Sequence, residues 1–108
     1  MTVRELQETF GFGVVAMPQP DRMVSGGYVG DLLSWVMGRA QADQVWITIM
    51  SNVNTVAVAS LSDVSTVLLA EGVTLDEDLV RTAEEKGVNV LCSDLSAFQL
   101  ATLLGPAV

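Results

Sequence analysis

The stretch QVWITIMSNVNTVAVASLSDVSTVLLAEGV, residues 44–73, contains the pattern that decides the fold. Two apolar runs, QVWITIM (44–50) and VSTVLLA (64–70), are rich in β-branched residues and too short to be lone helices, so we interpret each as a buried strand. Between them lie a polar turn, SNVN (51–54), and a segment, TVAVASLS (55–62), that has the length of two helical turns. The stretch therefore predicts a strand, a turn, a helix and a second strand.

A further unit of the same kind follows. Residues 74–87, TLDEDLVRTAEEKG, predict a helix, because Thr74 and Glu77 stand at capping-box spacing and Gly87 supplies a C-terminal stop. The next apolar run, VNVLC (88–92), predicts a third strand.

Ser93 and Asp94 follow that strand as predicted helix caps, and the apolar segment 95–105 predicts the last helix. Strand and helix thus alternate from residue 44 onward. Alternation of this kind favours parallel strands joined by right-handed crossovers. Both faces of such a sheet are covered, which explains why the strands are continuously apolar.

The first part of the chain predicts additional elements. Residues 4–10 predict a short helix, and residues 12–17 and 23–29 predict extended segments. Asp31 is the predicted cap of a helix over residues 32–41. With 108 residues, half of them apolar, the chain suits one domain, residues 1–108. We predict a single three-layer α/β domain with a mostly parallel sheet.

Composition excludes several classes of function. The chain has 13 acidic residues against five basic ones, a net charge of −8, so we expect no nucleic-acid partner. It has no histidine and only one cysteine, Cys92, which removes the usual metal sites and histidine acid/base pairs. We therefore predict no catalytic residues, no metal and no cofactor.

The uncharged interval 44–62 is long enough to cross a bilayer, but eight of its 19 residues are polar, so we predict no membrane span. The start of the chain, MTVRELQETFG, contains Glu5 and Glu8 and no apolar run typical of a signal peptide. We expect a cytoplasmic protein.

Polar residues follow the three predicted strands at their carboxyl ends, where open α/β sheets place their ligand crevice. Backbone N–H groups of three helix starts would meet there, and such groups bind anions or amides. The predicted ligand-binding residues are Ser51, Asn52, Asn54, Glu71, Thr74, Ser93 and Asp94. The alternative is that each of them only caps a helix, because Ser, Thr, Asn and Asp are the preferred caps.

Several large apolar side chains exceed what one small α/β domain usually buries. They are Tyr28, Trp35, Met37, Trp46 and Met50. We assign them to the core or to a subunit interface, and we therefore predict a homodimer.

Two segments, YVGDLLSWVMGRAQADQVWITIMSNVNTVAVASLSDVSTVLLAEGV (28–73) and AEEKGVNVLCSDLSAFQLATLL (83–104), resemble the DRTGG domain family, in particular its small stand-alone members. The resemblance is strongest over residues 24–104. The chain departs from the two loops that give the family its name: it has Asn52-Val53-Asn54 in place of an Asp-Arg pair and Glu71-Gly72 in place of paired glycines.

The resemblance implies an α/β domain like the amino-terminal domain of HPr kinase/phosphorylase, without the catalytic P-loop domain. Related domains lie between CBS modules in regulatory pyrophosphatases and occur in long phosphotransacetylases, as dimerising or regulatory elements. Stand-alone forms are associated with iron-only hydrogenase and other anaerobic redox gene sets.

Three hypotheses on function follow. The first is a non-catalytic, homodimeric regulatory module that binds a small anionic or nucleotide ligand at the predicted site. The second is a protein-interaction subunit of a larger redox enzyme. The third is a kinase or transferase that uses Asp94 and Glu71 as carboxylates, although the chain lacks the histidine and the glycine-rich phosphate loop of such enzymes, and no lysine stands near the site.

Overall fold

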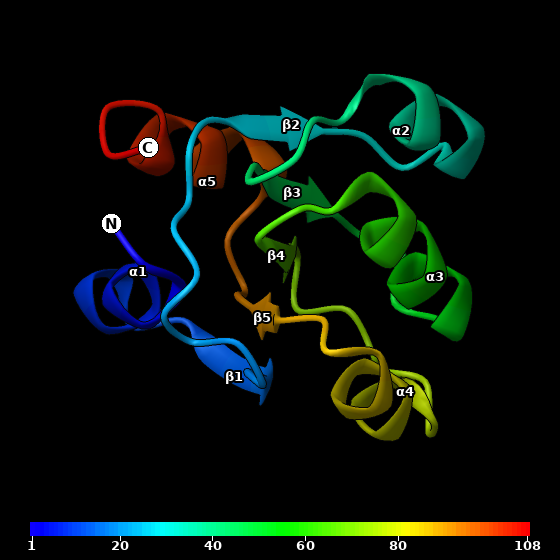
Figure 1. Cartoon of the computed structure of the whole chain (residues 1–108). Helices are drawn as coiled ribbons and strands as arrows, with labels where there is room; N and C mark the ends of the chain where they lie inside the picture. Colours follow the sequence, from blue (N-terminus) through cyan, green and yellow to red (C-terminus); the bar gives the residue numbers. More distant parts are fainter.

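The computed structural model describes residues 1–108 and shows one sheet between two layers of helices (Figure 1). The strands are β1 (Gly13–Ala16), β2 (Gly27–Val29), β3 (Val45–Thr48), β4 (Thr66–Leu69) and β5 (Val90–Cys92). The helices are α1 (Val3–Phe10), α2 (Leu33–Arg39), α3 (Val53–Ser62), α4 (Leu79–Lys86) and α5 (Ala97–Leu104). The predicted three-layer α/β fold is confirmed. None of the helices has the length and hydropathy that crossing a bilayer requires.

The five strands lie in the order β1-β5-β4-β3-β2. Strands β2 to β5 are parallel, and β1 joins β5 in the antiparallel direction. Because the parallel strands are neighbours in sequence as well as in space, right-handed crossovers place α2, α3 and α4 on the same face. Helices α1 and α5 cover the other face (Figure 1).

The central strands are buried on both faces, as their continuous apolar runs predict. Trp46 and Val67 point into the cluster below α2, α3 and α4. Their neighbours Ile47, Leu68 and Leu91 point into the second cluster, below α1 and α5. The alternation of strand side chains therefore builds two cores on one sheet.

Helix α4 begins later than predicted. Its first residue is Leu79, and Thr74 and Glu77 do not form a capping box. The preceding backbone is bound to the turn after β3 instead: the Ser51 hydroxyl donates to the Thr74 carbonyl at 2.7 Å, and the Asp76 N–H donates to the Ser51 carbonyl. These bonds hold the segment outside the helix.

Asp31 also has a different role from the predicted one. The N-cap of α2 is Leu32, which makes no side-chain cap. The Asp31 carboxylate accepts from the Thr48 hydroxyl at 2.8 Å and from the Ile49 N–H at 3.0 Å. It therefore ties the end of β2 to the end of β3.

A buried amide connects three segments of the chain. The Asn89 side chain is 2% exposed, donates to the carbonyls of Gln19 and Ser65, and accepts from the Gln19 N–H.

Replacing Asn89 with alanine leaves these buried backbone groups without partners. Asn89→Ala should lower the free energy of unfolding by about 2–4 kcal/mol, measured by urea denaturation. The matched control is Asn54→Ala, at an exposed position, and an equal loss in both variants would contradict the structural role of Asn89.

Candidate functional site

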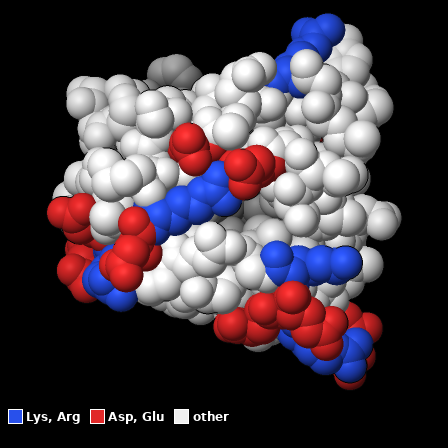
Figure 2. Space-filling model, in the orientation of Figure 1, with Lys and Arg blue, Asp and Glu red and all other residues white.

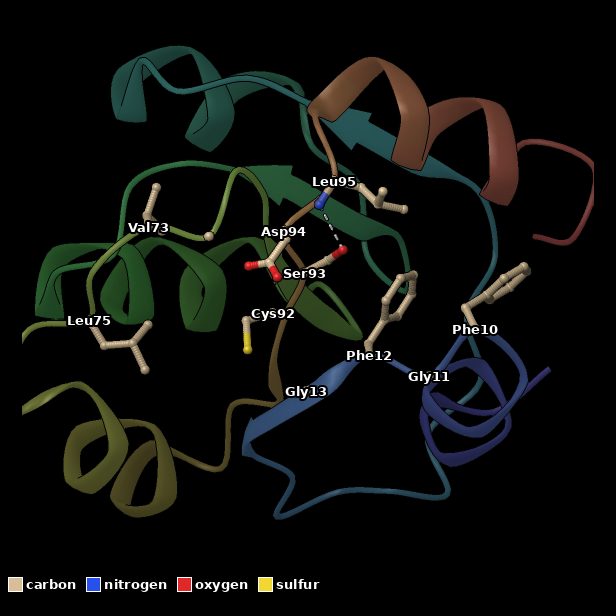
Figure 3. A pocket seen from close by; sticks show the side chains of 11 residues that line it. Phe10, Gly11, Phe12, Gly13, Val73, Leu75, Cys92, Ser93, Asp94 and Leu95 are labelled. Carbon is tan, nitrogen blue, oxygen red and sulfur yellow. Dashed lines mark hydrogen bonds between the residues drawn. The ribbon is translucent and has the colours of Figure 1, made fainter.

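A cleft of about 530 Å³ lies at the carboxyl edge of the sheet, next to the ends of β4 and β5 (Figure 3). Its walls come from residues 10–13, from residues 72, 73 and 75, and from residues 92–95. Strand β1 contributes because it runs antiparallel to β5, so its first residue pairs with the last residue of β5. The cleft therefore occupies the edge where open α/β sheets bind ligands.

Four of the seven predicted ligand-binding residues line this cleft or are next to a lining residue in the chain. Ser93 and Asp94 line it, and Glu71 immediately precedes the lining residue Gly72. Thr74 lies between the lining residues Val73 and Leu75, and its carbonyl accepts from the Ser51 hydroxyl.

The two asparagines lie at the start of α3, outside the cleft-lining set. The Asn52 side chain accepts from the Asn54 N–H at 2.9 Å, which is the bond of a helix cap. The structure thus brings together the polar residues after β4 and β5 and joins Ser51 to Thr74, but it leaves the two asparagines apart.

The turn after β4 is fixed to the segment after β5. The N–H of Glu71 donates to the Leu95 carbonyl at 2.8 Å, and the N–H of Gly72 donates to the Ser93 carbonyl at 3.0 Å. Both turn residues have left-handed backbone conformations, with φ of 66° at Glu71 and 61° at Gly72. A left-handed glutamate costs about 1–2 kcal/mol, and such strained positions cluster at functional sites.

Asp94 is exposed, and its carboxylate is available to a ligand. The last helix is capped by Ser96 and Gln99 and not by Asp94 as predicted. The Ser93 hydroxyl accepts from the Leu95 N–H at 3.1 Å (Figure 3). The chain's ion pairs join its arginines to acids other than Asp94.

Cys92 lies in the cleft beside Asp94 (Figure 3). Burial raises the pKa of its thiol, and the negative charge of Asp94 raises it further. The thiol is therefore protonated at neutral pH, a state with little nucleophilic reactivity. No group of three or more Cys, Asp or Glu side chains in residues 1–108 is placed to hold a metal ion.

The cleft has a negative electrostatic character. Asp94 is the charged residue in its lining, Glu71 stands next to it, and no lysine or arginine takes part. Val73 and Leu75 add apolar surface on the side that faces Cys92 and Asp94 (Figure 3). A carboxylate accepts hydrogen bonds and donates none, so the cleft suits a ligand with hydroxyl or amino donors and an apolar face.

Sequence reasoning missed the contribution of residues 10–13. The signal present in the sequence is GFG at 11–13, a glycine pattern that is typical of a turn or bulge. Gly11 ends α1 in a left-handed conformation, and Gly13 lies against Cys92, where a Cβ atom would stand 2.7 Å from the sulfur. What the pattern does not show is the pairing of β1 with β5, which carries these residues to the cleft.

No family model and no curated protein matches the chain. A solved structure does: the CBS and DRTGG domains of the regulatory region of Clostridium perfringens pyrophosphatase, complexed with the activator diadenosine tetraphosphate. The TM-score is 0.70 with 13% sequence identity, over 95% of this chain and 45% of that chain. This chain therefore spans less than half the length of its structural neighbour. The predicted resemblance is confirmed for the fold, which is DRTGG-like.

Gly72 has a left-handed backbone and lies against the exposed side chain of Asp94. A Cβ atom there would lie 2.7 Å from Oδ1 of Asp94, in addition to the strain of its left-handed backbone. Gly11 is a matched control, because its φ is +69° and a Cβ atom there would meet nothing within 4 Å. Gly11→Ala should lower the free energy of unfolding by about 1–2 kcal/mol and Gly72→Ala by roughly 1 kcal/mol more. Equal losses in urea denaturation would show that Asp94 does not crowd Gly72.

Proposed function

We propose that this chain is a non-catalytic regulatory module that binds a small ligand in the cleft at the carboxyl edge of the sheet. The observation that carries the proposal is the exposed Asp94 carboxylate in a 530 Å³ cleft with apolar walls. Clefts that combine apolar surface with a few placed polar groups are the usual form of small-molecule sites. Ser93, Asp94 and Glu71 are the predicted residues that we place at the ligand.

The proposed ligand is a nucleoside or nucleotide recognised through its base and sugar. The regulatory region of the Clostridium perfringens pyrophosphatase, which shares this fold over 45% of the solved chain, is complexed with diadenosine tetraphosphate, which supports a nucleotide. Because no lysine or arginine lines the cleft, the phosphates would stay in solvent. The Asp94 carboxylate would accept from ribose hydroxyls or a base amino group, while Val73 and Leu75 contact the base.

The chemistry of the cleft supports a role without catalysis. The chain has no histidine, and the raised pKa of Cys92 keeps the thiol protonated. Without a histidine or lysine in the cleft to accept its proton, neither Cys92 nor Ser93 has the partner that usually activates such a nucleophile.

Exposed apolar side chains support a homodimer as the working unit. Phe98 is 81% exposed and Trp35 is 53% exposed. These side chains, which one copy of the chain leaves exposed, could be buried against a second copy. The same side chains favour a second candidate function, an interaction subunit of a larger redox enzyme with no small ligand.

The proposed site is tested by thermal unfolding with adenosine, AMP, ATP and diadenosine tetraphosphate. A ligand at 100 times its dissociation constant stabilises the folded state by about 2.7 kcal/mol. In a domain of this size that should raise the midpoint by roughly 10 °C or more. Adenosine should produce the shift, and added phosphates should not increase it.

Asp94→Asn should abolish the shift, because the amide cannot replace the carboxylate as a double acceptor. The matched control is Glu85→Gln, which removes one negative charge from α4 outside the cleft and should keep the shift. Equal responses of both variants, or shifts that grow with the number of phosphates, would contradict the proposed site. Unchanged midpoints across the panel would favour the interaction subunit.

A further inference from the structure

We propose that two copies of the chain associate through the free edge of β2, so that their sheets join into one. This inference deepens the homodimer proposed above and rests on it, but it does not depend on a ligand in the cleft. Its occupant is a second copy of this chain, paired antiparallel about a twofold axis.

Strand β2 is the last strand of the sheet, and one of its two edges has no partner within the chain. On the inner edge, the carbonyl of Gly26 accepts from Val45 N–H and the N–H of Gly30 donates to the Ile47 carbonyl. Backbone groups alternate along a strand, so those of Gly27 and Val29 face the open edge. A row of unpaired backbone N–H and C=O groups on an edge strand can pair with a strand of another chain.

Apolar surface continues from this edge onto α5. A groove of about 160 Å³ lies between β2 and the second half of α5, with Val29, Ala101 and Val108 among its lining residues. Phe98, near the start of α5, is the most exposed of the large apolar side chains. Exposed Trp35 lies on α2, the helix that follows β2.

The distribution of charge selects a second copy as the occupant. The chain carries a net charge of −8, so two copies repel each other wherever their acids meet. No charged side chain occurs in residues 23–30 or 95–108. In Figure 2 the acidic side chains lie over the middle and lower parts of the molecule, and the upper margin, over β2 and α2, shows a basic side chain and no acidic one. Two copies therefore meet there with the least repulsion.

The open edge also sets the register of the pairing. In an antiparallel pair, two opposed residues exchange both backbone hydrogen bonds when both face the partner strand. Gly27 would therefore lie opposite Val29 of the partner subunit, and Val29 opposite Gly27 of the partner subunit, with the axis at Tyr28. Because β2 is at the opposite side of the sheet from β1 and β5, this dimer leaves the cleft open.

The test is the mass in solution of the full chain, by sedimentation velocity over a range of concentrations. The wild type should sediment at twice the mass of the 11.5 kDa chain. Val29→Pro removes the outward N–H and is tolerated on an edge strand, and Phe98→Glu places a charge on α5. Each should weaken dimerisation by about tenfold or more, as loss of a central interface contact does.

The matched control is Leu61→Glu, because Leu61 is 74% exposed on α3, away from β2 and α5, and this variant should remain dimeric. Circular dichroism verifies that each variant is folded. A monomeric wild type would overturn the dimer itself. A dimer that Val29→Pro leaves intact, or that Leu61→Glu disrupts equally, would overturn the β2 edge as its surface. Adenosine binding by a monomeric variant would show that the proposed ligand site does not need the dimer.

Discussion

The carboxyl edge of the sheet depends on two backbone hydrogen bonds, from Glu71 to Leu95 and from Gly72 to Ser93. They lock the turn after β4 against the segment after β5, and they require a left-handed backbone at both turn residues. As a result Gly72 lies directly against the Asp94 carboxylate, in space that a Cβ atom would fill. The carboxylate stays exposed because Ser96, two residues later, takes over the capping of α5.

Electrostatics then limits what the cleft accepts. A carboxylate placed there in a chain of net charge −8, with no basic residue in the lining, repels phosphates and favours groups that donate hydrogen bonds. The same negative charge, added to burial, raises the pKa of the Cys92 thiol and keeps it protonated. The Asp94 side chain therefore contributes both to the expected ligand preference of the cleft and to the raised pKa of the Cys92 thiol. That combination is the basis of the proposed binding role without catalysis.

The parallel part of the fold could be predicted from the sequence, because β3 and β4 are buried on both faces and appear as continuous apolar runs. The position of Ser93 and Asp94 at the carboxyl edge follows from the same parallel topology. The antiparallel pairing of β1 with β5 could not be predicted, because local sequence patterns do not indicate which distant strands pair with each other. The predicted cap at Thr74 failed for a related reason: a long-range partner, Ser51, competes for that backbone.

The most direct test of the central claim is a titration of the ¹⁵N-labelled chain with adenosine, followed by amide NMR signals. Shifts should be concentrated at Gly13, Gly72 and Asp94, which line the cleft, and the signals of Asn52 and Asn54 at the start of α3 should not move. Shifts centred on Asn52 and Asn54 would place the site at the start of α3. A spectrum that adenosine leaves unchanged at saturating concentration would contradict the nucleoside-binding cleft.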